Sequence, residues 1–287
     1  MNRRNFINTG AAAGLSFLGL QKYLDAAPRT HNPYGSLVSD PNGILDLPKG
    51  FKYQILSRTG DLMDDGLRVP GVPDGMAAFP GKDGKVILVR NHEMSYGSAS
   101  ISALADGATP VQNMLDLAYG KENSVPCSGG TTNVVYNPKT QTVEKQFLSL
   151  AGTDRNCAGG SMPWGSWITC EEPADLTSKR GRQHGYCFEV KATDDGKLQK
   201  AIPLKALGRV RHEAVALDPK TGILYLTEDM SDGLFYRFIP DVKGDLTSGK
   251  LQALALGGRA SADLRNYKES KRNLKVGREL KVKWIDL

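Results

Sequence analysis

The chain has 287 residues, of which 40% are hydrophobic and 24% are charged, and its formal net charge is +6 at neutral pH. That length suffices for one domain with a sizeable core. The positive charge is concentrated in residues 259–287, where only Tyr267 and Trp284 accompany the lysines and arginines. A nucleic-acid-binding protein would interleave basic and aromatic residues on one face, so this class is disfavoured.

The N-terminus has the features of an export leader. Arg3 and Arg4 form a twin-arginine pair, and residues 10–20 are small and apolar. Ala26-Ala27 provides the small residues at which a leader is cleaved. About eleven apolar residues are too few for a membrane-spanning helix. We therefore expect residues 1–27 to be a twin-arginine signal peptide, and the mature protein to be periplasmic or secreted without a stable membrane span. An uncleaved anchor or a chance arginine pair is the alternative.

Beyond the leader, short β-rich runs alternate with turn residues. A short helix is predicted around residues 111–118. The turns at Asn137-Pro138 and Asp218-Pro219 are typical of hairpins in antiparallel sheets. Strands are predicted at residues 51–56, 85–89, 132–136, 143–148, 167–169, 186–190, 214–217, 223–226, 234–238 and 251–256.

Acidic motifs recur at intervals near 40 residues. Glu172 and Glu213 are 41 residues apart, and Glu93 precedes Glu172 by 79 residues. A period of this size matches a four-stranded propeller blade. The predicted fold is therefore an all-β propeller over residues 28–287, with a β-sandwich as the alternative. Ten to twelve strands make about three blades, whereas a propeller usually has roughly four to eight, so we expect a C-terminally truncated form of a longer protein.

Several strand ends carry oxygen ligands, which suit Ca²⁺ or ferric iron better than zinc. Clustered cations would recruit anionic substrates and stabilise charge in phosphoryl transfer. Taken singly, each acidic residue is better explained as a solvated or salt-bridged surface group. The candidate ligands are Glu93, Glu172, Glu213 and Glu228, with Asn91, Thr132 and Asp229 as supporting donors and Arg90 and Arg211 as candidate phosphate-binding groups.

Two further segments are interpreted as loops. The glycines at 159–160 are taken as a turn before the strand at 167–169, because glycine turns let a backbone approach a ligand closely. The acidic residues Asp61, Asp64, Asp65 and Asp74 lack the spacing of an EF-hand and are taken as a polar region.

The four cysteines are Cys127, Cys157, Cys170 and Cys187. In an exported protein such a set favours two disulfides. The competing hypothesis is that one thiolate binds a metal and leaves the others unevenly paired.

Four segments together resemble the PhoX-type alkaline phosphatases: residues 90–93, the segment from Cys157 to Glu172, residues 211–214 and residues 227–229 with 235–238. The resemblance implies a six-bladed propeller whose channel holds calcium and iron, twin-arginine export, and hydrolysis of phosphomonoesters. It also implies that Cys157 ligates iron, that Glu172 and Glu213 bind metal, and that Asn91 lies on the substrate or metal side. The family's catalytic arginine and further acidic ligands lie beyond the last motif of this chain.

We therefore expect an exported metal-dependent phosphatase that acts on phosphomonoesters, with Ca²⁺ and Fe³⁺ as cofactors. The expected partner is a phosphorylated small molecule, not a nucleic acid, and the expected state is a monomer. A non-catalytic calcium-binding scaffold, or another calcium-dependent propeller hydrolase such as a lactonase, is the alternative. The expected catalytic residues are Asn91 and Arg211, and the expected metal ligands are Cys157, Glu172, Glu213, Glu93 and Glu228.

Overall fold

The computed structural model describes residues 33–111, 113–122, 125–173, 181–257, 262–265 and 277–287, and the predicted leader lies outside them. The chain divides into two units, Met1–Ile55 and Leu56–Leu287. In the first unit, strands β1 (Leu37–Val38) and β2 (Leu47–Pro48) pair antiparallel. No helix among the described residues is long and apolar enough to cross a bilayer.

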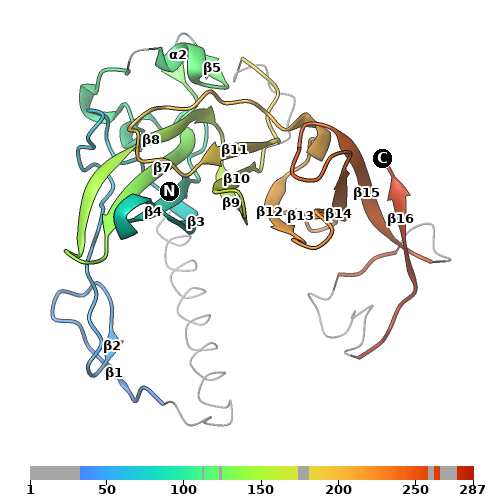
Figure 1. The fold of residues 1–287 in the computed structure, drawn as a ribbon, viewed down its shortest axis with the longest axis horizontal. Helices are drawn as coiled ribbons and strands as arrows, with labels where there is room; N and C mark the ends of the chain where they lie inside the picture. Colours follow the sequence, from blue (N-terminus) through green and yellow to red (C-terminus); the bar gives the residue numbers. More distant parts are fainter. Residues whose placement is uncertain (1–32, 112, 123–124, 174–180, 258–261, 266–276) are drawn as a thin grey trace, which may run out of the picture. The chain divides into compact units, whose positions relative to one another are not determined.

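The larger unit consists of antiparallel sheets whose strands mostly follow chain order (Figure 1). One sheet has the order β3-β4-β7-β8, a second β11-β10-β9 and a third β12-β13-β14-β15-β16, and β5 pairs with β6. The strands are β3 (Pro73–Pro80), β4 (Val86–His92), β5 (Lys121–Glu122), β6 (Val125–Pro126), β7 (Gly129–Asn137), β8 (Thr142–Thr153), β9 (Asn156–Met162), β10 (Ser166–Glu171), β11 (Cys187–Lys191), β12 (His212–Leu217), β13 (Leu224–Glu228), β14 (Phe235–Pro240), β15 (Gly249–Leu256) and β16 (Val282–Asp286). The helical elements are α2 (Met114–Leu117) and the single 3-10 turns η1 (Lys82–Gly84), η2 (Ala99–Ile101), η3 (Ala105–Gly107) and η5 (Lys205–Leu207).

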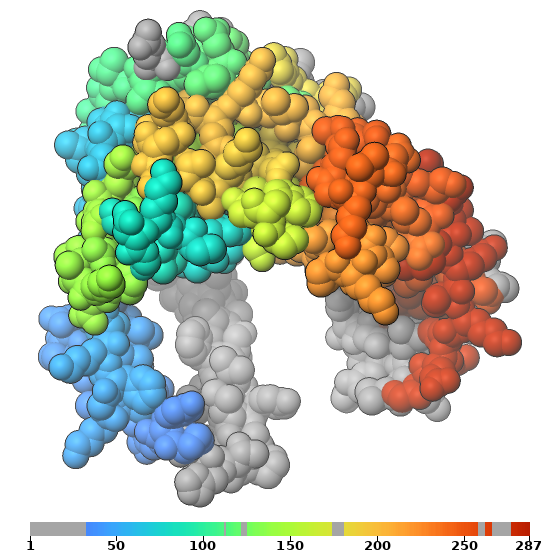
Figure 2. All heavy atoms as spheres, in the orientation of Figure 1, coloured from blue at the N-terminus to red at the C-terminus, as the bar shows by residue number. Residues whose placement is uncertain are grey.

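The three larger sheets meet through their edge strands. Strands β3, β9 and β12 are each the first strand of a sheet, and β9 contacts both β3 and β12. In Figure 2 the yellow-green surface around β9 lies between the teal surface of the β3–β4 region and the orange surface of the later strands. A sandwich would instead pack sheets face to face. Meandering sheets that meet at their first strands are arranged as propeller blades, so the all-β, propeller-like prediction is confirmed.

Apolar residues between the sheets form the core. Ile168 of β10 packs with Leu224, Leu226 and Phe238 of the five-stranded sheet, and all four are fully buried. On the other side, Phe188 of β11 packs with residues of β4 and β8 in a second cluster. Strand β10 is therefore buried along its whole length, which gives the residues at its C-terminal end a rigid support.

Most predicted strands are present, and so is the helix near residue 114. The predicted strand at residues 51–56 is wrong, because this segment has no regular structure. The strands that were not predicted include β3 and β9, and the two-residue strands β1, β2, β5 and β6. The glycines at 159–160 belong to strand β9 rather than to a turn; the turn lies at residues 163–165. Glycine suits β9 because a Cβ at Gly159 would meet the carbonyl oxygen of Ile168.

Candidate metal centre

Three edge strands each bring one ligand side chain to the candidate metal centre. Asp74 lies on β3, Cys157 on β9 and Glu213 on β12. Glycines allow these strands to approach closely: a Cβ on Gly75 would lie 2.8 Å from the Cα atom of Ala158. Because a side chain at such a position would push the strands apart, the glycines are what let the three ligands meet.

The ligand atoms form two groups that share one cysteine. Asp74, Glu93 and Cys157 offer ligand atoms within 4.8 Å of one another, and so do Cys157, Glu172 and Glu213. We call these five residues the metal centre. The predicted ligands Cys157, Glu172, Glu213 and Glu93 thus come together, although the chain separates them widely.

Cys157 is held between carboxylates. Its Sγ lies 3.2 Å from Oε1 of Glu213, to which the thiol donates, and 3.9 Å from Oδ1 of Asp74. Burial, the hydrogen bond to Glu213 and the neighbouring negative charges raise the pKa of the Cys157 thiol well above its ordinary value. A bound cation would reverse this balance, since a coordinating thiol loses its proton.

Glu172 follows β10 and is almost completely buried. Burial raises the pKa of its carboxyl group to about 7; the Arg155 guanidinium opposes this, while Glu93, Asp229 and Glu213 add to it. Its buried Oε2 atom lies against the Arg155 guanidinium but accepts no hydrogen bond of good geometry. A buried carboxylate oxygen that accepts no hydrogen bond of good geometry is suited to bind a cation.

Arg155 bridges two of the acidic residues. Its Nη2 lies 3.5 Å from Oε1 of Glu93 and also contacts Glu172. The residue has a left-handed backbone with φ of 51°, which a non-glycine residue adopts at a cost. Its amide donates to the carbonyl oxygen of Met94 at 3.0 Å and its carbonyl accepts from Glu172 at 3.2 Å, so the strained turn connects the segments that carry the two glutamates.

Asn91 lies fully buried beside the centre. Its Nδ2 donates to the carbonyl oxygens of Cys157 (3.0 Å) and Ala158 (2.8 Å), and its Oδ1 accepts from the Trp167 indole at 2.9 Å. These contacts tie β4 to β9 and β10. A substrate-side role for Asn91 stays a prediction.

The other predicted residues lie outside the two ligand groups. Arg211 is exposed next to β12, and its catalytic role stays a prediction. Glu228 accepts from the Tyr236 hydroxyl at 2.8 Å and from the Leu234 amide at 3.0 Å. Among the described residues it joins neither group, so its role as a ligand also stays a prediction.

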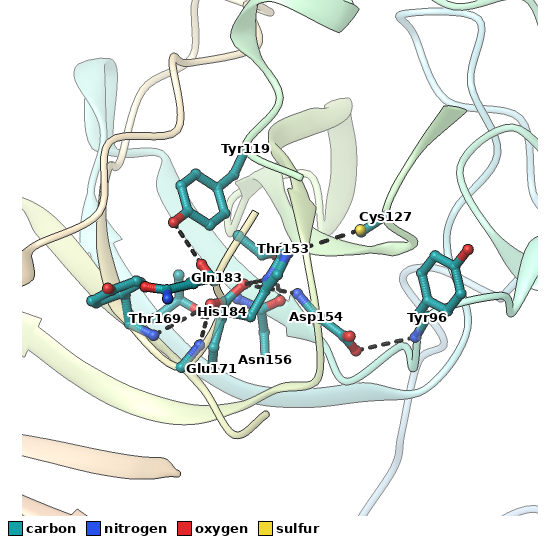
Figure 3. Close-up of polar contacts among 12 residues, drawn as sticks. Tyr96, Tyr119, Cys127, Thr153, Asp154, Asn156, Thr169, Glu171, Gln183 and His184 are labelled. Carbon is teal, nitrogen blue, oxygen red and sulfur yellow. Dashed lines mark hydrogen bonds and ion pairs between the residues drawn. The ribbon is translucent and has the colours of Figure 1, made fainter. Parts of the chain in front are cut away.

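A buried polar network supports β10, the strand that ends immediately before Glu172 (Figure 3). Oε1 of Glu171 accepts from Nδ1 of His184 at 2.6 Å and from the Asp154 amide at 3.0 Å, and Oε2 accepts from the Gly185 amide at 2.9 Å. Glu171 and His184 are essentially inaccessible to solvent. This network fixes β10 immediately before Glu172.

One residue of the metal centre, and one residue that contacts it, were not recognised in the sequence. Asp74 was assigned to a polar region, whereas it lies on β3, and Arg155 carried no motif. The available signal was the neighbouring glycine: Asp74 precedes Gly75 and Cys157 closely precedes Gly159-Gly160. Asp74 and Cys157 therefore each lie close to a glycine that permits close contact between strands.

Comparison with known proteins supplies the family. The family model for alkaline phosphatase PhoX matches residues 32–287. The chain belongs to the PhoX alkaline phosphatase family. This confirms the resemblance that the motifs indicated, and the match covers nearly all of the chain outside the predicted leader.

A solved structure also matches. It is Pseudomonas fluorescens PhoX in complex with vanadate, a transition state analogue, with a TM-score of 0.47 and 18% identity, over 73% of this chain and 52% of that chain. The chain thus spans about half the length of that PhoX structure. A comparison with curated proteins gave no match.

Proposed function

We propose that this protein is a metal-dependent phosphomonoester hydrolase, with calcium and iron bound at the metal centre. Membership of the PhoX family supports the reaction class. The observation that carries the proposal is the shared position of Cys157 between two sets of carboxylates from different sheets. A surface cluster of acidic residues would not need a partly buried thiol or a nearly buried glutamate at its middle.

The donor set fits the proposed cations. Carboxylate oxygens of Asp74, Glu93, Glu172 and Glu213 suit Ca²⁺, and the softer thiolate of Cys157 suits iron. We place iron at Cys157 and calcium among the carboxylates. When bound, the cations would attract a phosphate group and stabilise the charge that develops on its oxygens. The strands that carry the ligands supply the rigid geometry.

Arg155 is the group of this chain best placed to hold the substrate phosphate. In the structure its guanidinium is paired with Glu93 and Glu172. If both carboxylates turn to cations, the guanidinium keeps its position but loses its partners. It can then donate two parallel hydrogen bonds to phosphate oxygens. Arg211 and Asn91 remain candidates for contacts with the substrate.

The test is hydrolysis of an aryl phosphate by the metal-loaded protein at alkaline pH. We expect turnover that a chelator abolishes and that Glu213→Gln reduces by at least about 100-fold, since it removes a ligand. The matched control is Glu144→Gln, which alters an exposed pair with Lys85 and should keep full activity. Cation binding without turnover would instead indicate the scaffold alternative, and turnover of lactones alone would indicate a lactonase.

We also propose that residues 1–27 direct export by the twin-arginine route. The twin arginines, the short apolar stretch and the small residues at its cleavage site support this. The test is fractionation of cells that express the chain with Arg3→Lys and Arg4→Lys together. We expect the intact chain outside the cytoplasm and the variant inside it; equal distribution of the two would contradict export by this route.

A further inference from the structure

Two of the four cysteines face each other across neighbouring strands. Cys170 on β10 is the register partner of Cys187 on β11. Their Sγ atoms lie 3.6 Å apart, which is van der Waals contact, and both side chains are fully buried. Neither residue belongs to the metal centre, and both pack within the apolar core between the second and third sheets.

The hydrogen bonds around the pair show that its geometry suits a covalent bond. The amide of Glu171 donates to the carbonyl oxygen of Tyr186 at 3.1 Å. Glu171 and Tyr186, which are next to the two cysteines, are therefore a hydrogen-bonded pair of the antiparallel ladder. The carbonyl oxygen of Cys187 turns away from β10 and accepts from Leu204 at 2.9 Å. Cys170 and Cys187 are therefore a non-hydrogen-bonded pair, where Cα atoms lie about 4.5 Å apart, inside the range that disulfides span.

The other two cysteines have different surroundings. Sγ of Cys127 lies 4.0 Å from Nε2 of His184, and Cys157 lies among the carboxylates of the metal centre. A link from Cys157 to another cysteine would remove a ligand from that centre. Cys170 and Cys187 thus lie next to each other, whereas Cys127 and Cys157 each lie in a different environment.

We propose that Cys170 and Cys187 form a disulfide in the mature protein, and that Cys127 and Cys157 stay reduced. The oxidant is a disulfide donor, either a small-molecule disulfide or an oxidised dithiol protein. One cysteine thiolate attacks a donor sulfur, forms a mixed disulfide and releases one donor thiol. The second cysteine then attacks the mixed disulfide and releases the second donor thiol. Two protein thiols are oxidised and one donor disulfide is reduced.

Burial decides when the bond forms and how long it lasts. Both thiols are inaccessible once β11 has packed, and burial raises the pKa of the Cys187 thiol, so exchange takes place before the core closes. In the folded protein the same burial shields the bond from reductants. The bond closes the loop between β10 and β11 and anchors β10 two residues before Glu172, so it stabilises the strand that supports the metal centre.

In the cell the proposal rests on the export proposed above, because the chain must meet a disulfide donor. The experiment supplies the donor itself, so its outcome is independent of export and of phosphatase activity. The full chain is unfolded in reductant, refolded with mixed oxidised and reduced glutathione, and alkylated in denaturant. It is then digested with trypsin and chymotrypsin, since cleavage after Trp164 separates Cys157 from Cys170.

We expect one linked peptide pair that contains Cys170 and Cys187, with Cys127 and Cys157 alkylated. Four alkylated cysteines, or a link to Cys127 or Cys157, would overturn the proposal. A second measurement uses melting temperature. Reductant during refolding should lower it by about 5–10 °C in the parent chain and leave the Cys170→Ala/Cys187→Ala variant unchanged, and Cys127→Ala should respond as the parent does. An equal response in the double variant would also contradict the assignment.

Discussion

The thiol of Cys157 lies 3.2 Å from the carboxylate of Glu213, although the two residues are 56 positions apart in the chain and lie on different sheets. The contact exists because β9 and β12 pack edge to edge, and Gly160 brings their backbones together. The metal centre is thus a property of how blades meet rather than of any one segment.

Replacement of Glu172 by Gln should stabilise the metal-free protein and weaken cation binding. The pKa of Glu172 is about 7 in the folded chain, against 4.5 for an ordinary glutamate. A raised pKa means that its contribution to stability is present below pH 4.5 and is lost as pH rises through 7. We expect Glu172→Gln to raise the free energy of unfolding at pH 8 by about 1 kcal/mol in chelator, after allowance for screening.

The control for that variant is Glu144→Gln. Lys85 and Asn137 hold the pKa of Glu144 below its usual value, so its replacement should not stabilise the protein. Unfolding curves in denaturant at several pH values measure both variants. A Glu172→Gln protein that is less stable than its parent at pH 8 would show that this carboxylate is structural.

Replacement of Gly160 by Ala should separate β9 from β12. An added Cβ would meet the carbonyl oxygen of Val215 and lie 2.8 Å from its Cγ2. We expect a loss of about 2–3 kcal/mol in the free energy of unfolding, together with weaker cation binding. Gly165→Ala in the next turn is the control, since its φ of 85° is left-handed but nothing lies within 4 Å. It should cost only about 1 kcal/mol; equal losses would argue against the close approach.

Replacement of Asn91 by Asp should destabilise the fold itself. The Nδ2 group donates to the carbonyl oxygens of Cys157 and Ala158, and a carboxylate there would face two acceptors in a buried site. We expect a loss of about 3 kcal/mol or more. Trp167→Phe removes the indole donor to Asn91 and part of a buried ring, and the lost hydrogen bond by itself should cost about 1 kcal/mol. Thermal unfolding of metal-free protein measures both, and an unchanged Asn91→Asp melting temperature would contradict this tie between strands.

Buried His92 should make the protein sensitive to acid. Burial, and the positive charge of Arg90, lower the pKa of His92 to about 3. Its ring nitrogens contact the Gly71 carbonyl oxygen and the Thr132 hydroxyl, each at 3.0 Å. Because the pKa in the folded protein lies below the ordinary histidine value of 6.5, the stabilisation by neutral His92 is present above pH 6.5 and is lost as pH falls toward 3.

The measurement is the difference in unfolding free energy between the parent chain and His92→Gln as a function of pH. We expect this difference to shrink by about 1 kcal/mol for each pH unit below 6. A difference that stays constant from pH 7 to pH 4 would mean that His92 is not held neutral.

The sequence was sufficient to predict the strands that lie away from the contacts between sheets. Strands such as β4, β8 and β15 have alternating or continuous apolar runs, which indicate burial directly. The edge strands β3 and β9 were missed because their glycines and prolines are typical of turns. At these positions glycine permits close contact between sheets. The hydrophobic pattern along one segment does not reveal that a neighbouring blade will pack against it.

The residues of the candidate site likewise divide into those that the sequence indicated and those that it did not. Glu93, Glu172 and Glu213 were found because each follows or begins an apolar strand, and Cys157 through the family resemblance. Asp74 was missed together with its strand. Arg155 was missed because its position depends on a left-handed turn at a non-glycine residue, which propensity does not indicate.

The measurement that tests the central claim most directly is the calcium and iron content of the purified full chain, compared with that of a Cys157→Ser/Glu213→Gln variant. We predict that the parent retains both elements after gel filtration and that the folded variant loses iron completely. If the parent holds neither element after growth and purification with both supplied, or if the variant retains as much as the parent, these five side chains are not a metal centre.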